Sequence, residues 1–203
     1  MYCNFFDDAF GWLYGSKFTK LTIGDNITKI GDYMFGDCST LTNIVIPSQV
    51  VSIGKCAFNS CTSLTEVVIP NSVTTIGELA FVNCQSLTGF YGKFASADNR
   101  CLIVDGVLHG FAPAGLTTYT IPDSVTSIGS YAFLNCTRLG RVYCKPTTPP
   151  SMGNNLAFVY HSDYYDEYYY IGCAIYVPTA SVKAYKAAAN WSTYADYIVG
   201  YNF

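Results

Sequence analysis

Apolar residues recur along this chain with a period of 23 positions. Four segments of that length share one spacing of apolar residues, and they begin at Phe18, Leu41, Leu64 and Leu116. A longer unit spans 87–115, and a degenerate unit starts at Leu139. Near-copies at a fixed spacing predict a repeat architecture in which each unit packs only on its neighbours.

The first half of each unit is predicted to form a strand. Apolar residues alternate there, as Ile44 and Ile46 show, and alternation is the period of a strand. A proline such as Pro47 follows and ends the strand, because proline cannot donate to a strand ladder. Stacked copies would place equivalent strands in a parallel sheet, about 4.8 Å apart.

The second half of each unit carries three recurrent residue types. A glycine indicates a backbone angle that a side chain would forbid; these glycines are Gly31, Gly54, Gly77 and Gly129. A phenylalanine is expected to point inward from a short helical turn; these are Phe35, Phe58, Phe81 and Phe133. A cysteine closes the unit; these are Cys38, Cys61, Cys84 and Cys136.

The four recurrent cysteines are predicted to form a structural ladder of reduced thiols. A free cysteine behaves as a small apolar residue, and three consecutive stacked thiols cannot pair off evenly. A linear column also does not converge on a metal ion, so we expect no metal site. The disulfide state of Cys3, Cys56, Cys101, Cys144 and Cys173 stays open, and Cys144 could face Cys173 across the terminal module.

The repeats suggest one continuous domain in three parts. A partial coil at 1–17, where Ala9-Phe10 resembles the Ala-Phe pair of a repeat, precedes regular coils at 18–138. A degenerate coil and a C-terminal cap occupy 139–203. The irregular coil 87–115 contains Asp105-Gly106 between two apolar runs, which predicts a hairpin that projects from the stack or widens it. Both a tolerated insertion and a contact loop fit this hairpin.

The cap is predicted to contain a helix and a final strand. Thr179 or Ser181 would cap a helix that runs to about Ala189. Its inner face is expected to hold Val182, Tyr185 and Ala189, with Trp191 as a further candidate. The run 197–199 is expected to add the final strand.

Composition and charge exclude several classes of protein. Half of the chain is apolar and 12% is charged, so it is not intrinsically disordered. The net charge of −3 comes with no basic cluster, which excludes nucleic acid as the expected partner. No apolar run approaches the length of a membrane helix. The two histidines, His109 and His161, lie in no catalytic context, and His161 occupies the cysteine position of the degenerate coil.

Two surfaces are candidates for recognition. Segment 160–170 holds six tyrosines and three acidic residues; it is expected to be either a loop for binding or one that covers the last coil. Its candidate contact residues are Tyr164, Tyr165, Tyr168 and Tyr169. The outward row of the strands is predicted to be Thr22, Val45, Val68, Tyr91, Thr120 and Tyr143. The neighbouring row ends at Arg141. On these two rows the candidate binding residues are Tyr91, Tyr143 and Arg141.

The repeat L-x-x-[IV]-x-I-P-x-x-V-x-x-I-G-x-x-A-F-x-x-C over about residues 18–138 resembles the leucine-rich repeat of BspA-like bacterial surface proteins. Segments 144–150 and 175–187 resemble the lead-in and the C-terminal module of that family. The resemblance implies a leucine-rich-repeat solenoid of the α/β, strand-rich class, with stacked parallel strands, short helical turns and a helix-containing cap. It also implies export or surface attachment, and some members of the family are adhesins.

The function expected from this resemblance is a non-enzymatic binding or adhesion module of a bacterial cell-surface or secreted protein. We expect a protein or glycan partner, no cofactor, no nucleic acid and no membrane insertion. A structural spacer or scaffold segment without a ligand is the alternative. The first residues show no basic and apolar leader, so a cytoplasmic location is the alternative to an extracellular one.

Overall fold

The computed structural model describes residues 2–3, 13–162 and 165–203. The chain folds into two compact units. The first unit contains the residues up to Val104 together with His109–Ala114, and the second contains Asp105–Leu108 and Gly115–Phe203. The partial coil predicted at 1–17 falls largely outside the described residues, and the boundaries drawn from the sequence stay predictions.

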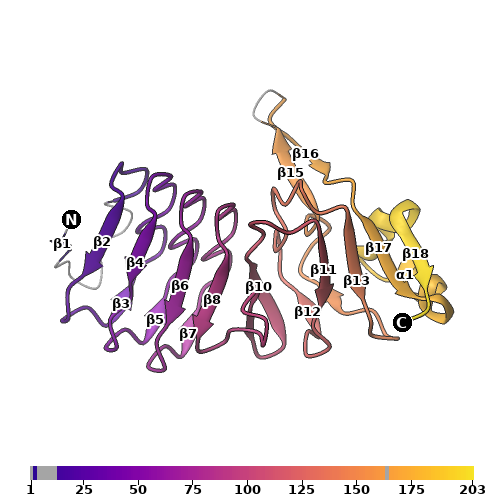
Figure 1. Cartoon of the computed structure of the whole chain (residues 1–203), viewed down its shortest axis with the longest axis horizontal. Helices are drawn as coiled ribbons and strands as arrows, with labels where there is room; N and C mark the ends of the chain where they lie inside the picture. Colours follow the sequence, from indigo (N-terminus) through magenta and orange to yellow (C-terminus); the bar gives the residue numbers. More distant parts are fainter. Residues whose placement is uncertain (1, 4–12, 163–164) are drawn as a thin grey trace. The chain divides into compact units, whose positions relative to one another are not determined.

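Two series of short parallel strands build the first unit (Figure 1). One series contains β1 (Tyr2–Cys3), β2 (Lys20–Ile23), β4 (Asn43–Val45), β6 (Glu66–Ile69) and β8 (Gly89–Gly92). The other contains β3 (Lys29–Ile30), β5 (Ser52–Ile53) and β7 (Thr75–Ile76). The strands pair as β1-β2-β4, β6-β8 and β3-β5-β7. Ile30 pairs with Ile53, and Ile53 with Ile76, so equivalent positions of successive repeats lie side by side.

The irregular coil contains the predicted hairpin. β9 (Cys101–Val104) and β10 (Val107–Phe111) are neighbouring strands. Asp105 and Gly106 join them with φ angles of 50° and 79°, as a tight hairpin turn requires. Val107 and Leu108 pair with the next strand of the second unit. Leu102 and Leu108 are fully buried, so the hairpin is part of the packed coils, and the prediction that it projects is wrong.

The second unit repeats the two series with additions. The first series is β11 (Thr118–Ile121), β13 (Arg141–Cys144), β17 (Ala174–Pro178) and β18 (Ile198–Tyr201), which pair in parallel in that order. The other series is the start of β10, β12 (Ser127–Ile128) and β14 (Ser151–Met152). An antiparallel pair, β15 (Val159–Ser162) and β16 (Glu167–Tyr170), follows β14 and precedes β17 along the chain.

Phenylalanine rings stack inside both units. In the first unit, the Phe58 ring lies 5.2 Å from those of Phe35 and Phe81. In the second unit, Phe133 stacks on Phe158 at 4.7 Å. All five are buried to at least 99%. The inward direction predicted for the recurrent phenylalanines is therefore confirmed.

The Ala-Phe pair of the repeat has a structural reason in the backbone. The amide of Phe35 donates to the carbonyl of Ala57 at 2.8 Å, and that of Phe58 donates to the carbonyl of Ala80 at 2.8 Å. A small alanine lets the neighbouring coil approach closely enough for this bond, and the aromatic ring then fills the interior.

The recurrent glycine is required for a different reason from the one predicted. Gly54 and Gly77 do not have positive φ. A Cβ atom on Gly54 would lie 2.6 Å from the carbonyl carbon of Gly31, and one on Gly77 would lie 2.4 Å from the amide nitrogen of Lys55. The glycines thus permit close approach of successive coils, and the predicted forbidden backbone angle is wrong.

Positive φ angles occur two and six residues after each recurrent glycine instead. The earlier set is Tyr33, Cys56, Leu79 and Tyr131, and the later set is Asp37, Ser60, Asn83 and Asn135, with φ between 53° and 64°. Each left-handed residue reverses the chain locally. The segments expected to be short helical turns are accordingly sequences of hydrogen-bonded tight turns.

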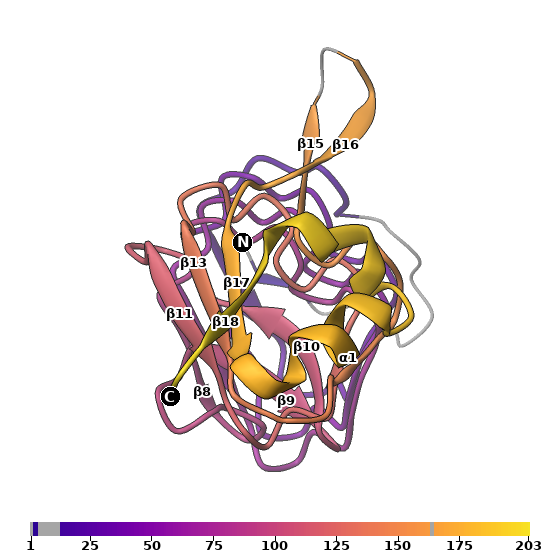
Figure 2. The same cartoon turned by 90° about the vertical axis from the view of Figure 1, so that its right-hand side faces the viewer.

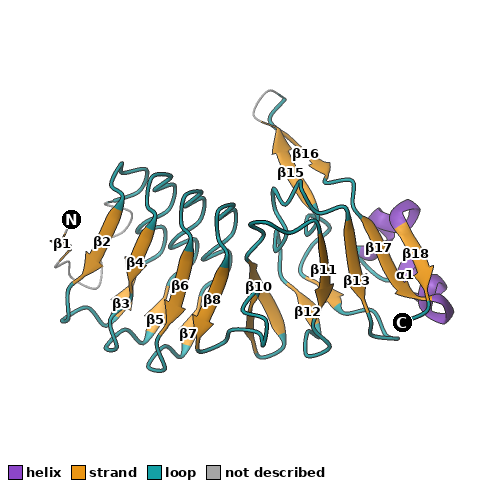
Figure 3. Cartoon of the chain, in the orientation of Figure 1, coloured by secondary structure: helices purple, strands orange, loops and turns teal. Residues whose placement is uncertain are grey.

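The helices lie at the C-terminal end of the second unit (Figure 3). They are the 3-10 helix η1 (Thr179–Ser181), α1 (Val182–Ala187) and the 3-10 helix η2 (Trp191–Tyr197). Neither the Thr179 nor the Ser181 side chain caps α1, which ends two residues before Ala189. Ala189 is exposed, so its place on an inner face was wrongly predicted. The final strand is confirmed as β18.

Aromatic side chains anchor this cap through their polar tips. Tyr185 donates to the carbonyl of Pro146 at 2.8 Å, and Trp191 donates to that of Pro150 at 2.6 Å. Tyr194 donates to the carbonyl of Asn155 at 2.6 Å. These bonds satisfy carbonyls that lie outside the strands, and all three rings are buried.

Candidate functional site

The outer side of the sheet β11-β13-β17-β18 carries the candidate site. Alternation along these short strands sends every second residue outward. The register aligns Thr120 with Tyr143, Tyr143 with Tyr176, and Tyr176 with Val199. One outward row therefore crosses the whole sheet and becomes aromatic at its centre.

Four aromatic side chains form one cluster on this side, which we name the aromatic face; they are Tyr143, Tyr176, Tyr201 and Phe203. Tyr143 and Tyr176 stack at 4.9 Å with an interplanar angle of 17°. Tyr201 meets Tyr143 at 5.3 Å and 70°, and Phe203 meets it at 6.2 Å and 79°. The four rings thus hold each other in fixed orientations.

The aromatic face is open to solvent and bordered by positive charge. Tyr201 is 42% exposed and Phe203 is 52% exposed. Arg141, two residues before Tyr143 on β13, is exposed, and Lys145, just past the end of that strand, is exposed too. The site therefore combines aromatic ring surface with an arginine, a composition common in interfaces between proteins, and a lysine lies at its edge.

Sequence reasoning identified part of this face. The structure brings Tyr143 and Arg141 together on β13, as adjacent outward positions. It adds Tyr176, Tyr201 and Phe203, which the sequence analysis missed. The alternation of Ile175, Tyr176 and Val177 was the available signal, because it continues the outward row into the terminal module.

Tyr91 lies in the first unit, on β8. Its ring folds over Gly89, where a Cβ atom would lie 3.1 Å from the tyrosine hydroxyl. The rest of that outward row contains small or aliphatic residues, with Val45 59% exposed and Val68 57% exposed. The row of the first unit therefore offers an apolar but mainly aliphatic surface.

The tyrosine-rich segment is a two-stranded antiparallel hairpin, β15–β16, where the sequence suggested a loop. We name its described residues, 159–162 and 165–170, the tyrosine hairpin. Tyr160 stacks on Tyr169 at 5.6 Å, and Tyr168 lies 4.9 Å from the His161 ring. Tyr165 and Tyr168 are exposed, whereas Tyr164 lies outside the described residues.

His161 belongs to a strand of this hairpin and not to a turn equivalent to the cysteine position. Its Nε2 atom lies 3.2 Å from the Asp166 carboxylate, and its amide donates to the Asn135 side chain at 2.9 Å. The chain forms a strand from Val159, where β15 begins, so His161 does not lie in the turn that holds the cysteine of a regular repeat.

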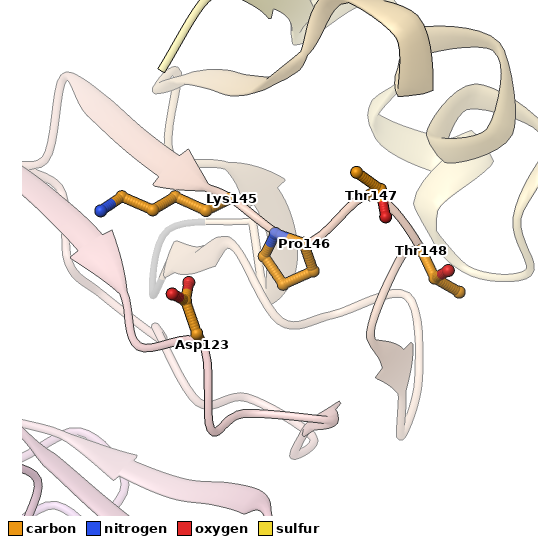
Figure 4. Close-up of a pocket in the computed structure, with 5 residues that line it drawn as sticks. All are labelled: Asp123, Lys145, Pro146, Thr147 and Thr148. Carbon is orange, nitrogen blue, oxygen red and sulfur yellow. The ribbon is translucent and has the colours of Figure 1, made fainter.

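A cavity of about 420 Å³ lies where β13 ends, lined by Asp123, Lys145, Pro146, Thr147 and Thr148 (Figure 4). Figure 4 shows the Asp123 carboxylate and the Lys145 side chain on one side of it. Both residues are exposed, so water surrounds their charges. An active site needs converging groups in a drier environment, and we assign this cavity no catalytic role.

The recurrent cysteines are buried and form no disulfide, and the same holds for Cys56, Cys101, Cys144 and Cys173. Cys61 donates to the carbonyl of Phe35 at 3.1 Å, and Cys84 donates to that of Phe58 at 3.3 Å. Burial raises the pKa of Cys84 to about 12. Thiols that stay protonated are poor nucleophiles and poor metal ligands, which fits a packing role for these side chains.

Two further thiols contact tyrosines. Tyr185 donates to Cys144, and the Tyr170 hydroxyl contacts both the carbonyl and the sulfur of Cys173. Cys144 and Cys173 do not form the disulfide that the sequence left open. Across the described ranges, no group of three or more metal-ligating side chains occurs, and no helix has the length and apolarity to cross a membrane.

Comparison with known proteins extends these observations. A leucine-rich cell surface protein from Faecalibacterium prausnitzii A2-165 is similar in structure, with a TM-score of 0.60 and 28% sequence identity over 67% of this chain. The match covers 38% of that protein, so this chain spans less than half of its length. A leucine-rich repeat protein of T. pallidum is 26% identical over 62% of this chain and 45% of its own, with a TM-score of 0.36.

No curated protein matches the chain significantly. The BspA type leucine rich repeat region matches in six copies, over residues 7–96 and 109–158. These residues are more than half of the chain, and they contain the stacked phenylalanines, the close-approach glycines and the four recurrent cysteines. The chain belongs to the BspA-type leucine-rich-repeat family.

Proposed function

We propose that this chain is an extracellular binding module of a bacterial surface protein and that it holds a protein partner on its aromatic face. The observation that carries the proposal is the ring cluster beside Arg141, in which Tyr201 and Phe203 are exposed and Tyr143 and Tyr176 are half-buried. Clustered aromatic and arginine side chains are typical of the residues that dominate binding energy.

The position of the cluster supports a role in recognition. The rings lie on the outer side of the sheet, where three successive coils of the first unit carry Thr22, Val45 and Val68 and only the last carries a tyrosine, Tyr91. The repeat therefore does not require aromatic residues there. An exposed apolar patch that folding does not require is typical of an interaction site.

The ring geometry favours a protein over a glycan. Tyr143 and Tyr176 lie nearly parallel, so each covers a face of the other. Tyr201 and Phe203 meet Tyr143 at steep angles. A sugar ring needs a flat, uncovered aromatic face, whereas ring edges and tyrosine hydroxyls suit the carbonyls and side chains of a protein.

The cell-surface protein from F. prausnitzii supports the extracellular location. The competing function is that of a structural spacer, in which the outer side of the sheet contacts no partner. A binding experiment distinguishes the two, because only the binding module depends on particular side chains of the aromatic face.

The experiment measures binding of the labelled chain to intact bacterial and epithelial cells, with and without prior treatment of the cells by protease or glycosidases. We expect saturable binding that protease treatment abolishes. The double variant Tyr143→Ser and Tyr176→Ser should bind at least about tenfold more weakly. Val68→Ser, which changes an exposed outward residue of the first unit, should bind like the wild type.

Each other outcome has a defined meaning. Loss of binding after glycosidase treatment alone would replace the protein partner by a glycan. No saturable binding by the folded wild-type chain on any of these surfaces would support the spacer. Equal losses in the double variant and in Val68→Ser would overturn the assignment to the aromatic face.

A further inference from the structure

The tyrosine hairpin is a second feature of the second unit with exposed side chains. β15 and β16 pair along their whole length, from Val159 with Tyr170 to Ser162 with Glu167. Figures 1 and 2 show this pair extending beyond the coils in two perpendicular views. A strand pair that projects in this way adds little to the core and presents its side chains to other molecules.

The base of the hairpin is fixed. The Asn135 side chain accepts the His161 amide, and the Tyr168 ring lies 5.5 Å from that of Tyr131. The amide of Ile171 donates to the carbonyl of Phe158 at 3.1 Å. These contacts hold the strands in their projecting position, so the exposed groups are available to a partner molecule.

The exposed groups of the hairpin complement those of the aromatic face. The hairpin presents Tyr165, 65% exposed, beside the exposed carboxylates of Asp166 and Glu167. The aromatic face presents rings between the cations Arg141 and Lys145. Opposite charges beside matching aromatic surface favour association and fix its orientation.

We propose that the tyrosine hairpin of one copy of this chain docks on the aromatic face of a second copy. This inference rests on the proposed function, because it names one occupant of the same face. The contact joins two different surfaces, so a pair of copies keeps one free face and one free hairpin, and copies associate head to tail into open chains. Such self-association would join neighbouring copies displayed on one surface or on two opposed cells.

Sedimentation of the purified chain tests the proposal. A hairpin on a small face buries less than the roughly 1,200 Å² of a stable interface, so we expect dissociation constants between about 10 µM and 1 mM. The mean mass should rise with concentration in this range. The dissociation constant should be several-fold lower at low salt than at high salt, because salt screens the attraction between opposite charges.

Two variants with complementary defects identify the surfaces. The face variant is Tyr143→Ser with Tyr176→Ser, and the hairpin variant is Asp166→Lys with Glu167→Lys. Each alone should associate at least about tenfold more weakly than the wild type. An equimolar mixture should regain a one-to-one dimer, since one variant retains the hairpin and the other retains the face.

The matched control is Asp25→Lys with Glu66→Lys, which changes the same charge at exposed positions of the first unit. It should associate like the wild type. A wild type that stays monomeric to about 1 mM, an equal loss in the control, or a mixture of variants that forms no dimer would overturn the proposal. If cell binding still depends on the aromatic face in that case, the proposed function stands without self-association.

Discussion

The two units build the same repeat from different side chains. The first unit places identical residues above one another: phenylalanine on phenylalanine and thiol after thiol. The second unit retains one such stack, Phe133 on Phe158, and completes its interior with Tyr185, Trp191 and Tyr194, which have no counterpart in the repeat. The repetition therefore runs through the interior of the first unit, whereas the cap replaces part of it in the second unit.

The outward rows show the consequence of this difference. In the first unit the row contains Thr22, Val45 and Val68 and ends with a single tyrosine, Tyr91. In the second unit Thr120 is followed by two stacked tyrosines, Tyr143 and Tyr176. Interior packing and outward composition are independent, because alternate residues of a strand face opposite sides. The fold can therefore acquire a recognition surface while the repeat that supports it stays unchanged.

The largest effect is expected from breaking the phenylalanine stack. Phe58→Ala should lower the free energy of unfolding by about 3–5 kcal/mol, because it leaves a cavity between Phe35 and Phe81. Urea denaturation of the purified variant measures the change. A loss below about 1 kcal/mol would contradict a tightly packed interior in the first unit.

A smaller loss is expected where two coils touch. Gly77→Ala should cost about 1–3 kcal/mol, since its Cβ atom would overlap the backbone of Lys55 and Gly54. Gly140→Ala is the matched control in the second unit, because its Cβ atom would meet only the Thr117 carbonyl, at 3.8 Å. The two denaturation curves should separate, and equal midpoints would refute the close-approach explanation.

The repeat made most of the fold predictable, and the glycine shows where the prediction stopped. The spacing that recurs within this chain shows that Gly54 and Gly77 occupy equivalent positions of successive repeats. Whether such a glycine serves a backbone angle or the approach of a neighbour depends on the next coil, which spacing does not describe. The same limit explains Cys56 and Leu79, whose positive φ angles no composition rule would suggest.

The sequence predicted only those residues of the aromatic face that lie within a repeat. Tyr143 and Arg141 followed from alternation within a repeat. Tyr201 and Phe203 come from a strand whose pairing with β17 depends on the intervening cap. The segment 160–170 was recognised by composition, but its hairpin arises from cross-strand pairs such as Tyr160 with Tyr169, which the repeat does not encode.

Alkaline titration compares a thiol of each unit. Cys84 donates to a carbonyl, and burial raises its pKa to about 12. Burial also raises the pKa of Cys144, to about 11, and the hydrogen bond that this thiol accepts from Tyr185 lowers the pKa by less than burial raises it. Both folded pKa values exceed the ordinary value of 9.0. The contribution of each thiol to the free energy of unfolding is therefore fully present below about pH 9. Above that pH the thiols of the unfolded chain ionise, and the free energy of unfolding falls by about 1.4 kcal/mol per pH unit for each thiol.

Two alanine variants isolate these contributions. In urea denaturation between pH 7 and pH 12, Cys144→Ala should flatten the decline up to about pH 11, and Cys84→Ala should flatten it up to about pH 12. Each variant should retain a constant offset at neutral pH from the lost packing. An unchanged slope in either variant would show that its thiol ionises at an ordinary pKa.

The smallest effect is expected on the aromatic face. Tyr176→Thr gives the second unit a residue typical of the outward row in the first, and it removes the stacking on Tyr143. The loss in unfolding free energy should stay near 0.5–1.5 kcal/mol, the usual contribution of an aromatic pair. Thermal and urea denaturation measure it, with Val68→Thr as the control that leaves no ring unpaired. A loss comparable to that of Phe58→Ala would mean that the outer rings support the fold, and the face could then no longer be explained by recognition alone.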